Sequence, residues 1–325
     1  MKRDTGEKIV KILAEKGRVT AREMRELLQI SRQGLYLQIA KLSRKGRIAK
    51  IGKSPRVYYF IPDLKEKSEG FVLDKKTASF VDERYLYVSP LGEKLAGMGG
   101  FEKWCVKTGQ EVAKTAREYM LTQQKYDKWI KGGVISGLDK LGRTFPVVYL
   151  DKLYYLDFYS IERFGRTKLG QLLLYAKQSQ SREVIRELVT SVEIRVRKLI
   201  EKHQIESAGF VPPTVRREVQ LMRELEIGLG LLLPIVKIRK VQMELMIPQK
   251  TLSRLEDRVE NAAKTIVVEE KRKHGNILLI DDAMGSGATL NETAKQIRER
   301  GVAGGKIVGL VIVGSYKGFD VISEV

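Results

Sequence analysis

The stretch ILLIDDAMGSGATL, at residues 277–290, constrains the fold of this chain more than any other. Its four leading apolar residues are typical of a strand in a parallel sheet, which is buried on both faces. Two aspartates follow, Asp281 and Asp282, and then a glycine-rich turn. The residues after the turn predict a helix from about Ala288 to Arg300. A buried strand, a turn and a helix in this order predict an α/β domain.

The same stretch predicts a ligand site, because open α/β sheets bind ligands at the carboxyl ends of their strands. Free amides of the turn and of the helix N-terminus can surround a phosphate, and Ser286 and Thr289 add hydroxyl groups. Carboxylates repel phosphate, so the acidic pair suits sugar hydroxyls or a magnesium ion. A Walker A loop is excluded by the spacing of Gly301 to Lys306, and Leu290 stands where a dinucleotide-binding loop needs its third glycine. An ordinary sheet edge or a Walker B strand is the alternative interpretation.

This stretch resembles the phosphoribosyl pyrophosphate loop of type I phosphoribosyltransferases, with Ser286 in place of the usual first threonine. The resemblance implies a phosphoribosyltransferase-like parallel sheet with flanking helices. It also implies that the acidic pair lies near the ribose hydroxyls, and that Mg²⁺ binds with phosphoribosyl pyrophosphate and reaches Asp281 and Asp282 through that ligand. The residues expected to bind phosphoribosyl pyrophosphate are Asp281, Asp282, Ala283, Met284, Gly285, Ser286, Gly287, Ala288 and Thr289. Some family members carry an acidic catalytic base at the position of Gly285, so the catalytic residue stays unassigned here.

A second region, residues 208–214, predicts a strand that ends in a proline turn, with Arg216 and Arg217 on a following helix. It resembles the pyrophosphate-side loop of the competence-protein-F subfamily. Pro248, Gln249, Leu252, Arg258 and Asn261 are similar to a further signature of that subfamily, and the likeness extends over residues 145–325. The expected pyrophosphate-side residues are Pro212, Pro213, Thr214, Arg217 and Arg258, with Lys237 and Arg239 as further candidate cations.

The first 62 residues predict a different, smaller module. One helix ends at Gly17, a second starts after Thr20 with Glu23 completing a capping box, and a third starts after Ser31. Two strands around a turn follow, at 47–51 and 56–61. This order is that of a winged helix-turn-helix domain, and the segment resembles bacterial winged-helix regulators.

Charge gives this module an expected partner. Residues 1–62 carry sixteen Lys and Arg against five Asp and Glu, a net +11 of the chain's +20. Such a concentration of cations favours a polyanion, and DNA in particular. The expected DNA-binding residues are Arg32, Gln33, Tyr36 and Lys41 on the third helix and Lys50, Lys53 and Arg56 on the wing. A winged helix used for protein contacts is the alternative.

The middle of the chain, residues 63–144, carries no recognisable chemistry and is expected to be a linker with a helical connecting or dimerisation region. It predicts a strand at 85–88 and one long helix over 101–130, on which packing or dimer contacts are expected of Trp104, Tyr119 and Trp129. One cysteine and two histidines in the whole chain exclude an internal disulfide and a Cys/His zinc cluster. The charged N-terminus and the short apolar runs predict a cytoplasmic protein with no membrane segment.

Together the domains expected at 1–62, 63–144 and 145–325 favour a DNA-binding transcription regulator. Its phosphoribosyltransferase-like domain would sense phosphoribosyl pyrophosphate or a nucleotide. The order of modules resembles that of Gram-positive purine repressors. A homodimer is expected, because operators are commonly palindromic. The alternative is an active phosphoribosyltransferase, in nucleotide salvage or in competence, that carries the winged helix as an accessory.

Overall fold

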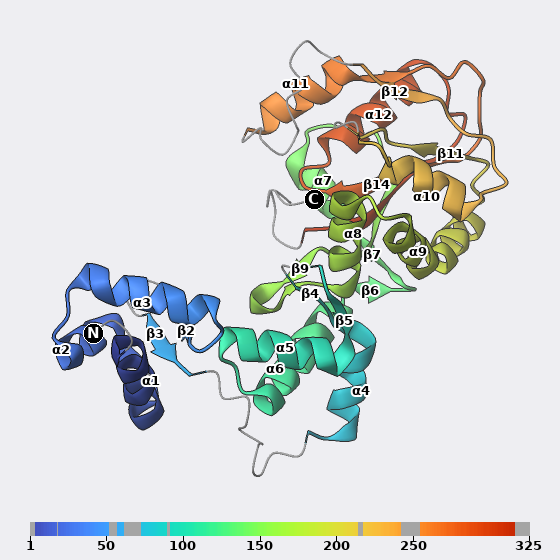
Figure 1. Cartoon of the computed structure of the whole chain (residues 1–325). Helices are drawn as coiled ribbons and strands as arrows, with labels where there is room; N and C mark the ends of the chain where they lie inside the picture. Colours follow the sequence, from blue (N-terminus) through green and yellow to red (C-terminus); the bar gives the residue numbers. More distant parts are fainter. Residues whose placement is uncertain are drawn as a thin grey trace. The chain divides into compact units, whose positions relative to one another are not determined.

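A computed structural model describes residues 4–17, 19–51, 57–61, 73–89, 92–213, 217–241 and 254–315. The chain forms two compact units, residues 1–121 and residues 122–325, whose helices and strands are labelled in Figure 1. The finer division into three parts at residues 62 and 144 stays a prediction. Each unit is described by itself below.

The first unit begins with three helices and a small sheet. The elements are α1 (Asp4–Lys16), β1 (Val19–Thr20), α2 (Ala21–Leu28), α3 (Arg32–Arg44), β2 (Ala49–Ile51) and β3 (Tyr58–Phe60). The strands are antiparallel in the order β1-β3-β2. Apolar side chains at helical spacing, among them Ile9, Met24, Leu35 and Ile39, form one buried cluster between these elements. The capping box of Thr20 and Glu23 starts α2 as predicted.

The rest of the first unit consists of α4 (Lys75–Arg84), the strand pair β4 (Leu86–Val88) and β5 (Lys94–Ala96), α5 (Gly97–Thr108) and α6 (Val112–Asp127). Four aromatic rings, those of Tyr85, Phe101, Trp104 and Tyr119, pack with centroids 4.9–6.2 Å apart. Packing of Trp104 and Tyr119 and the predicted strand near residue 86 are confirmed, whereas Trp129 is 55% exposed and does not pack in this way.

The prediction of one long helix over 101–130 is wrong, because two helices, α5 and α6, occupy this stretch. Gly109 ends α5 with a φ of 65°, a left-handed conformation that favours glycine. The carboxylate of Glu111 then accepts hydrogen bonds from the backbone amides of Ala113 and Lys114, both at 3.1 Å. These bonds satisfy free backbone donors at the start of α6. The glycine cap of α5 and the glutamate cap of α6 therefore favour two helices in this stretch.

The second unit contains a six-stranded sheet in the order β11-β14-β15-β8-β7-β6. Its strands are β6 (Ile130–Lys131), β7 (Val134–Ser136), β8 (Lys152–Phe158), β11 (Ser207–Phe210), β14 (Ile277–Met284) and β15 (Ile307–Gly314). The four strands β11, β14, β15 and β8 are parallel, and β7 and β6 continue the sheet antiparallel. Every residue of β15 is buried, as expected of a strand covered on both faces.

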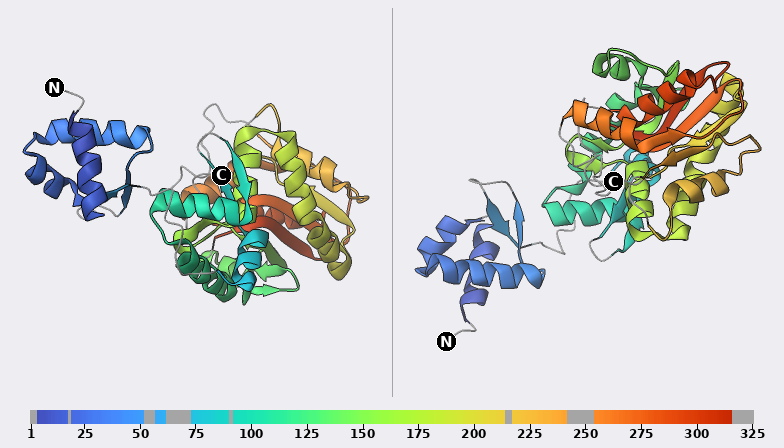
Figure 2. Two further views of the ribbon diagram at one scale, coloured as in Figure 1. Left: turned by 60° about the horizontal axis from the view of Figure 1, so that its bottom comes forward. Right: turned by 90° about the horizontal axis from the view of Figure 1, so that it is seen from above.

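Helices cover the sheet on both sides (Figure 2). They are α7 (Leu138–Thr144), α8 (Lys168–Ser179), α9 (Arg182–His203), α10 (Leu221–Leu229), α11 (Leu255–Thr265) and α12 (Ala288–Glu299). Helix α8 packs on α9 and on β8 and β15, while α12 packs on α11 and β14. Short pieces complete the unit: β9 (Ser160–Ile161), a 3₁₀ turn (Glu162–Phe164), β10 (Gly165–Arg166), and the antiparallel pair β12 (Ile238–Lys240) and β13 (Ile266–Val268). The mixed α/β architecture with a mostly parallel sheet agrees with the sequence.

The structure corrects the prediction that Arg217 lies on a helix. Helix α10 starts only at Leu221, and Arg217 lies in the segment before it. The guanidinium of Arg217 donates a hydrogen bond to the backbone carbonyl of Lys177, near the end of α8, and the side-chain amide of Gln220 donates to the carbonyl of Arg217 at 2.8 Å. These bonds fix the segment against α8. Arg216 lies outside the described residues.

Within the part of the chain that the structure describes, no helix is both long enough and apolar enough to cross a membrane.

Candidate functional site

The acidic pair lies within β14, near its carboxyl end. The strand continues through Asp281 and Asp282 to Met284, so it is longer than the four apolar residues alone predicted. β14 lies between β11 and β15, and Asp281 is paired with Val311. Because these strands are parallel, their carboxyl ends meet at one edge of the sheet. The aspartates therefore lie at the same edge as the turn after β14.

The turn from Gly285 to Gly287 connects β14 directly to α12. Gly287 is the N-cap residue and has a φ of 86°. A Cβ built on it would lie 2.5 Å from Cδ1 of Leu141 and 3.0 Å from Cε of Met284. Both the backbone conformation and the surrounding space therefore require glycine. The hydroxyl of Ser286 is turned to the helix start, where it accepts a 3.3 Å hydrogen bond from the amide of Ala288.

A lysine from α8 reaches the acidic pair. The Nζ atom of Lys177 lies 2.8 Å from Oδ2 of Asp282, and the two side chains are only 18% and 13% exposed. A pair this well shielded from water is weakly screened by salt. Arg217, predicted on the pyrophosphate side, lies beside the backbone at the end of the same helix, where it donates a hydrogen bond to the carbonyl of Lys177. No local pattern in the sequence predicts the pairing of Lys177 with Asp282, because their contact depends on how α8 packs on the sheet.

A second lysine, Lys240 of β12, also interacts with the acidic pair. The chain before β12 runs parallel to β11, with a bridge between Ala208 and Ile235. Ile238 lies two residues before Lys240 in the strand. Its Cδ1 atom would be 2.9 Å from a Cβ atom built on Gly209, so this side of β12 faces β11. Lys240 is therefore carried toward the carboxyl edge of the sheet, where its charge acts on both aspartates.

Strand alternation separates Lys240 from Lys237 and Arg239, the candidate cations that the sequence suggested. Successive side chains of a strand point to opposite sides, and Lys237 and Arg239 are exposed whereas Lys240 is half-buried. Arg239 forms an exposed ion pair with Glu269, with Nε and Oε1 2.6 Å apart. The position of Lys240 could have been found from the alternation once β12 was recognised as a strand.

Two of the charged groups at this edge, Asp281 and Lys240, have shifted pKa values. Burial raises the pKa of Asp281, and the negative charge of Asp282 raises it further, while Lys177 and Lys240 oppose that shift. Burial lowers the pKa of Lys240, and the two aspartates oppose that shift in turn. The result is a cluster of two carboxylates and two ammonium groups, in which the ammonium groups limit the cost of burying the carboxylates.

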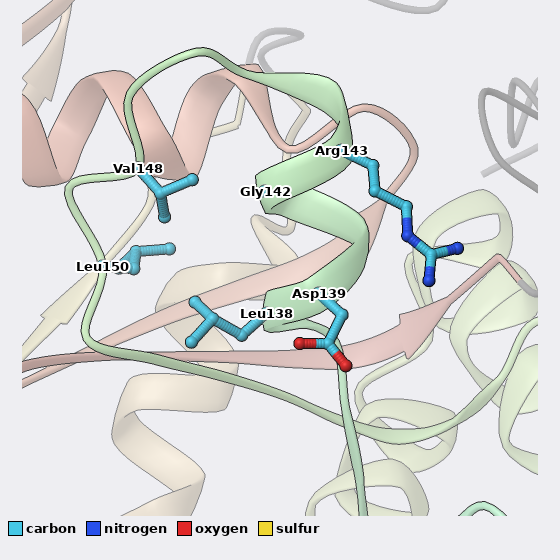
Figure 3. A pocket seen from close by; sticks show the side chains of 6 residues that line it. All are labelled: Leu138, Asp139, Gly142, Arg143, Val148 and Leu150. Carbon is cyan, nitrogen blue, oxygen red and sulfur yellow. The ribbon is translucent and has the colours of Figure 1, made fainter.

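Helix α7 lies over the glycine turn. Leu141 is the side chain that a Cβ at Gly287 would meet, and the ammonium of Lys140 donates to the carbonyl and the hydroxyl of Ser315 at 3.0 and 2.9 Å. Ser315 directly follows β15, so α7 is fixed to the carboxyl edge of two strands. An open pocket of about 530 Å³ lies beside α7, lined by Leu138, Asp139, Gly142, Arg143, Val148 and Leu150 (Figure 3). None of the predicted site residues lines it.

The remaining pyrophosphate-side residues are more scattered. Pro212 and Pro213 are half-buried in the turn after β11, and Thr214 lies outside the described residues, as do Pro248, Gln249 and Leu252. Arg258 is 5% exposed on α11, which packs against α12. Burial lowers the pKa of Arg258. Arg217 therefore contacts the end of α8, the helix that carries Lys177, whereas Arg258 is buried on a helix that packs against α12.

In the first unit, the predicted nucleic-acid contacts on α3 are among its exposed side chains. Leu35, Ile39 and Leu42 are buried on the other face. The residues Arg32, Gln33, Tyr36 and Lys41 of α3 and Lys50 of β2 are exposed. The guanidinium of Arg32 lies 5.8 Å from the ring centroid of Tyr36, one turn further along the helix. Lys53 and Arg56 lie outside the described residues.

No protein-family model matches the chain, and no curated protein matches it. Among solved structures, the chain matches the crystal structure of adenine phosphoribosyltransferase from Leishmania tarentolae with a TM-score of 0.26 and 12% sequence identity. The match covers 49% of this chain and 91% of that chain. This structural similarity is weak, and the functional argument below depends on the residues of the site.

Proposed function

We propose that the second unit binds a ribose phosphate ligand of the phosphoribosyl pyrophosphate or nucleotide class, and that the chain is a DNA-binding regulator that responds to it. The observation that carries this proposal is the arrangement at the carboxyl edge of β14. Two aspartates are followed directly by a turn that only glycine can make at Gly287, and then by a helix N-terminus.

The parts of this arrangement fit the parts of such a ligand. The amides at the start of α12 and the hydroxyls of Ser286 and Thr289 suit a 5′-phosphate, because an anion is stabilised at a helix N-terminus. The carboxylates of Asp281 and Asp282 suit the ribose hydroxyls, which can donate hydrogen bonds to them. Ala283, Met284, Gly285 and Ala288 shape the backbone between these two places.

Magnesium fits this site only together with the ligand. Asp281 and Asp282 offer hard oxygen atoms of the kind that Mg²⁺ takes. No group of three or more His, Cys, Asp or Glu side chains suited to a metal occurs among the described residues. Further ligands would therefore come from phosphoryl oxygens and water. When bound, the ion supplies neutralising charge to a pyrophosphoryl group.

In the first unit we propose a winged-helix module that binds DNA. Its helices and strands follow one another in the order of that module, and α3 offers a polar and basic exposed face opposite its buried one. Arg32, Gln33, Tyr36 and Lys41 would reach base edges and phosphates in the major groove, and Lys50 would meet the backbone. A dimer would match the symmetry of a palindromic operator.

Filter binding with operator-containing DNA fragments, with and without phosphoribosyl pyrophosphate and Mg²⁺, tests the regulator. We expect the ligand to change the DNA dissociation constant by about 5- to 150-fold, the usual range of coupling between two sites. Equal DNA affinity in both conditions would contradict the proposed switch.

The alternative is a catalytically active phosphoribosyltransferase with a winged-helix accessory. The position where some family members carry an acidic base is occupied here by Gly285, which favours a ligand sensor. Release of pyrophosphate from phosphoribosyl pyrophosphate, measured with a panel of bases and amines, separates the two. Turnover with any acceptor would support the enzyme, and the absence of turnover together with ligand binding would support the sensor.

A further inference from the structure

We infer that the amino-terminal edge of the sheet in the second unit binds the phosphate backbone of double-stranded DNA, through exposed lysines that the fold gathers there. These amino-edge lysines are Lys152, Lys202, Lys273 and Lys306. The inference goes beyond the proposed function, which assigns DNA contacts to the first unit alone. It concerns the opposite edge of the sheet from the acidic pair, since the seven residues of β8 span about 20 Å.

Two of the amino-edge lysines stand at the start of neighbouring parallel strands. Lys152 is the first residue of β8, and Lys306 directly precedes β15. Lys152 is opposite Val308 in the ladder, and Lys306 comes two residues before Val308. The amide of Ile277 donates to the carbonyl of Lys306 at 2.8 Å, so the ladder between β14 and β15 includes this lysine. Because side chains alternate along a strand, Lys152 and Lys306 project on the same side of the sheet.

The end of α9 brings a third lysine to this side. The Nζ atom of Lys202 lies 5.8 Å from the ring centroid of Tyr154, which follows Lys152 by two residues on β8. The rings of Tyr154 and His203 lie 5.4 Å apart. Burial lowers the pKa of His203, and the positive charges of Lys202 and of both strand lysines lower it further. Three ammonium groups therefore act on one place.

Hydrogen bonds of Asn276, just before β14, hold these segments together. Its Oδ1 atom accepts from the amide of Lys306 at 2.8 Å, and its Nδ2 atom donates to the carbonyl of His203 at 3.0 Å. The fourth lysine, Lys273, lies beside Gly304, where a built Cβ atom would be 2.9 Å from the lysine Cε. The long lysine side chains thus extend from a backbone whose segments are fixed to one another.

The positive charge at this edge is poorly compensated. Within the described part of the chain, none of the amino-edge lysines forms an ion pair with a carboxylate. Asp151 is instead paired with Arg298 at 2.6 Å, and Oε1 of Glu206 accepts a hydrogen bond from the amide of Asn276 at 3.3 Å. The exposed carboxylate of Glu201 offsets part of the charge. A group of cations with so few counter-charges attracts a polyanion.

The kind of cation indicates the kind of polyanion contact. A lysine ammonium is a mobile point charge, without the fixed fork of donors by which arginine recognises a single phosphate or carboxylate. Several such charges, spread over the starts of two strands and the end of a helix, suit the repeated phosphates of a DNA backbone. Contacts to phosphates position a protein on DNA but read no sequence.

The test is fluorescence anisotropy of the full chain with two labelled DNA duplexes of unrelated sequence, over a range of salt concentrations. The first-unit variant, Lys41→Ala with Lys50→Ala, removes contacts proposed for the first unit and serves as the background. The amino-edge variant adds Lys152→Gln and Lys306→Gln to that background. We expect the first-unit variant to keep residual, salt-dependent DNA binding.

A control variant removes the same charge elsewhere in the second unit, by Lys128→Gln and Lys131→Gln in the same background. Both lysines are exposed, and the hairpin of β6 and β7 lies toward the carboxyl end of β8. In the amino-edge variant the slope of log affinity against log salt concentration should fall by about 1.8, or about 0.9 for each lost phosphate contact. The fall should be equal on both duplexes, and the control should keep the slope of the background.

Each further outcome decides the inference. Equal slopes in the amino-edge variant and the control would overturn it, as would the absence of residual binding by the first-unit variant at low salt. Lys152→Arg with Lys306→Arg should keep the slope, and a loss equal to that of the glutamine variant would show that charge is not responsible. If the first-unit substitutions leave DNA binding unchanged while the amino-edge substitutions weaken it, the inference stands and the proposed DNA contact of the first unit fails. A folded wild-type chain that binds neither duplex would contradict both.

Discussion

At the scale of single residues, the site depends on a few positions at which the chemistry or the surrounding space requires one type of residue. Gly287 is one, because its φ is positive and its missing side chain makes room for Leu141. The acidic pair is another, because two adjacent carboxylates within a strand are stable only with cations nearby. Lys177 and Lys240 provide these cations.

We expect Gly287→Ala to lower the free energy of unfolding by about 1–3 kcal/mol, through backbone strain and the overlap with Leu141. Gly301→Ala is the matched control, because Gly301 has a φ of 67° with no atom within 4 Å of a built Cβ. Denaturant unfolding of both variants measures the difference. Equal losses in the two variants would show that the overlap with Leu141 contributes nothing.

A buried acid gives the second unit a distinctive pH dependence. Burial raises the pKa of Asp157 to about 6, although the backbone amide of Phe158 donates to its carboxylate at 2.7 Å and Arg195 carries the opposite charge nearby. The folded state then holds this proton more tightly than the unfolded state. Stability from this group is therefore full below its ordinary pKa, near 4, and is lost as the pH rises through 6.

Asp157→Asn should remove this dependence. The difference in free energy of unfolding between wild type and variant is expected to change by up to about 3 kcal/mol between pH 4 and pH 7, in favour of the variant at the higher pH. Chemical denaturation across this range measures it. Parallel stability curves for the two proteins would refute the assignment.

Single residues also show which parts of the site could be predicted from the sequence and which could not. Asp281, Asp282 and the glycine turn were predicted because they are contiguous and their spacing carries the signal. Lys177 is more than a hundred residues away from its partner Asp282, so no local pattern could reveal the pair. Lys240 was missed for a different reason, since it required the strand β12 to be recognised first.

At the scale of elements, capping residues set helix boundaries that the periodicity of apolar residues alone does not predict. Thr20 and Glu23 start α2 as the sequence predicts, whereas Gly109 and Glu111 divide the expected long helix into α5 and α6. The pattern of apolar residues runs through this break, which is why it favoured a single helix. The glycine and the glutamate were the signals that should have taken precedence.

One side chain of α12 connects this helix to the segment before β8. The side chain of Asn291 accepts a hydrogen bond from the amide of Tyr149 at 2.9 Å and donates one to the carbonyl of Val147 at 3.0 Å. Asn291 is 6% exposed, so its removal leaves two polar groups of the backbone without their protein partner. The contact stabilises the orientation of the helix whose N-terminus forms part of the site.

We expect Asn291→Ala to reduce the free energy of unfolding by about 1–3 kcal/mol. Glu299→Ala, at an exposed position of the same helix, serves as the control and should change stability by less than about 0.5 kcal/mol. Both values come from urea titration followed by circular dichroism. A loss in the Asn291 variant no larger than that in the control would rule out this contribution.

At the scale of the whole molecule, the charge of the chain is concentrated in the part proposed to bind DNA. Sixteen cationic residues within the first 62 belong to a chain with a net charge of +20. If these cations meet phosphates, DNA binding must weaken steeply with salt, because each contact releases a condensed counterion.

Lys50→Ala should reduce the slope of log affinity against log salt concentration by about 0.9, the loss of one phosphate contact. Arg22→Ala is the control, because Arg22 lies on α2 and is paired with Glu26 at 3.0 Å. Fluorescence anisotropy with labelled DNA between low and physiological salt gives both slopes. An unchanged slope for the Lys50 variant would exclude this lysine from the interface.

The central claim is that the edge of β14 is a site for a phosphorylated ribose, and calorimetric titration of phosphoribosyl pyrophosphate with Mg²⁺ into the folded chain tests it most directly. We predict saturable heat with one site per chain. In a variant with Asp281→Asn and Asp282→Asn, binding should be at least about tenfold weaker while circular dichroism still shows a folded protein. A folded wild-type protein that gives no heat of binding would contradict the claim.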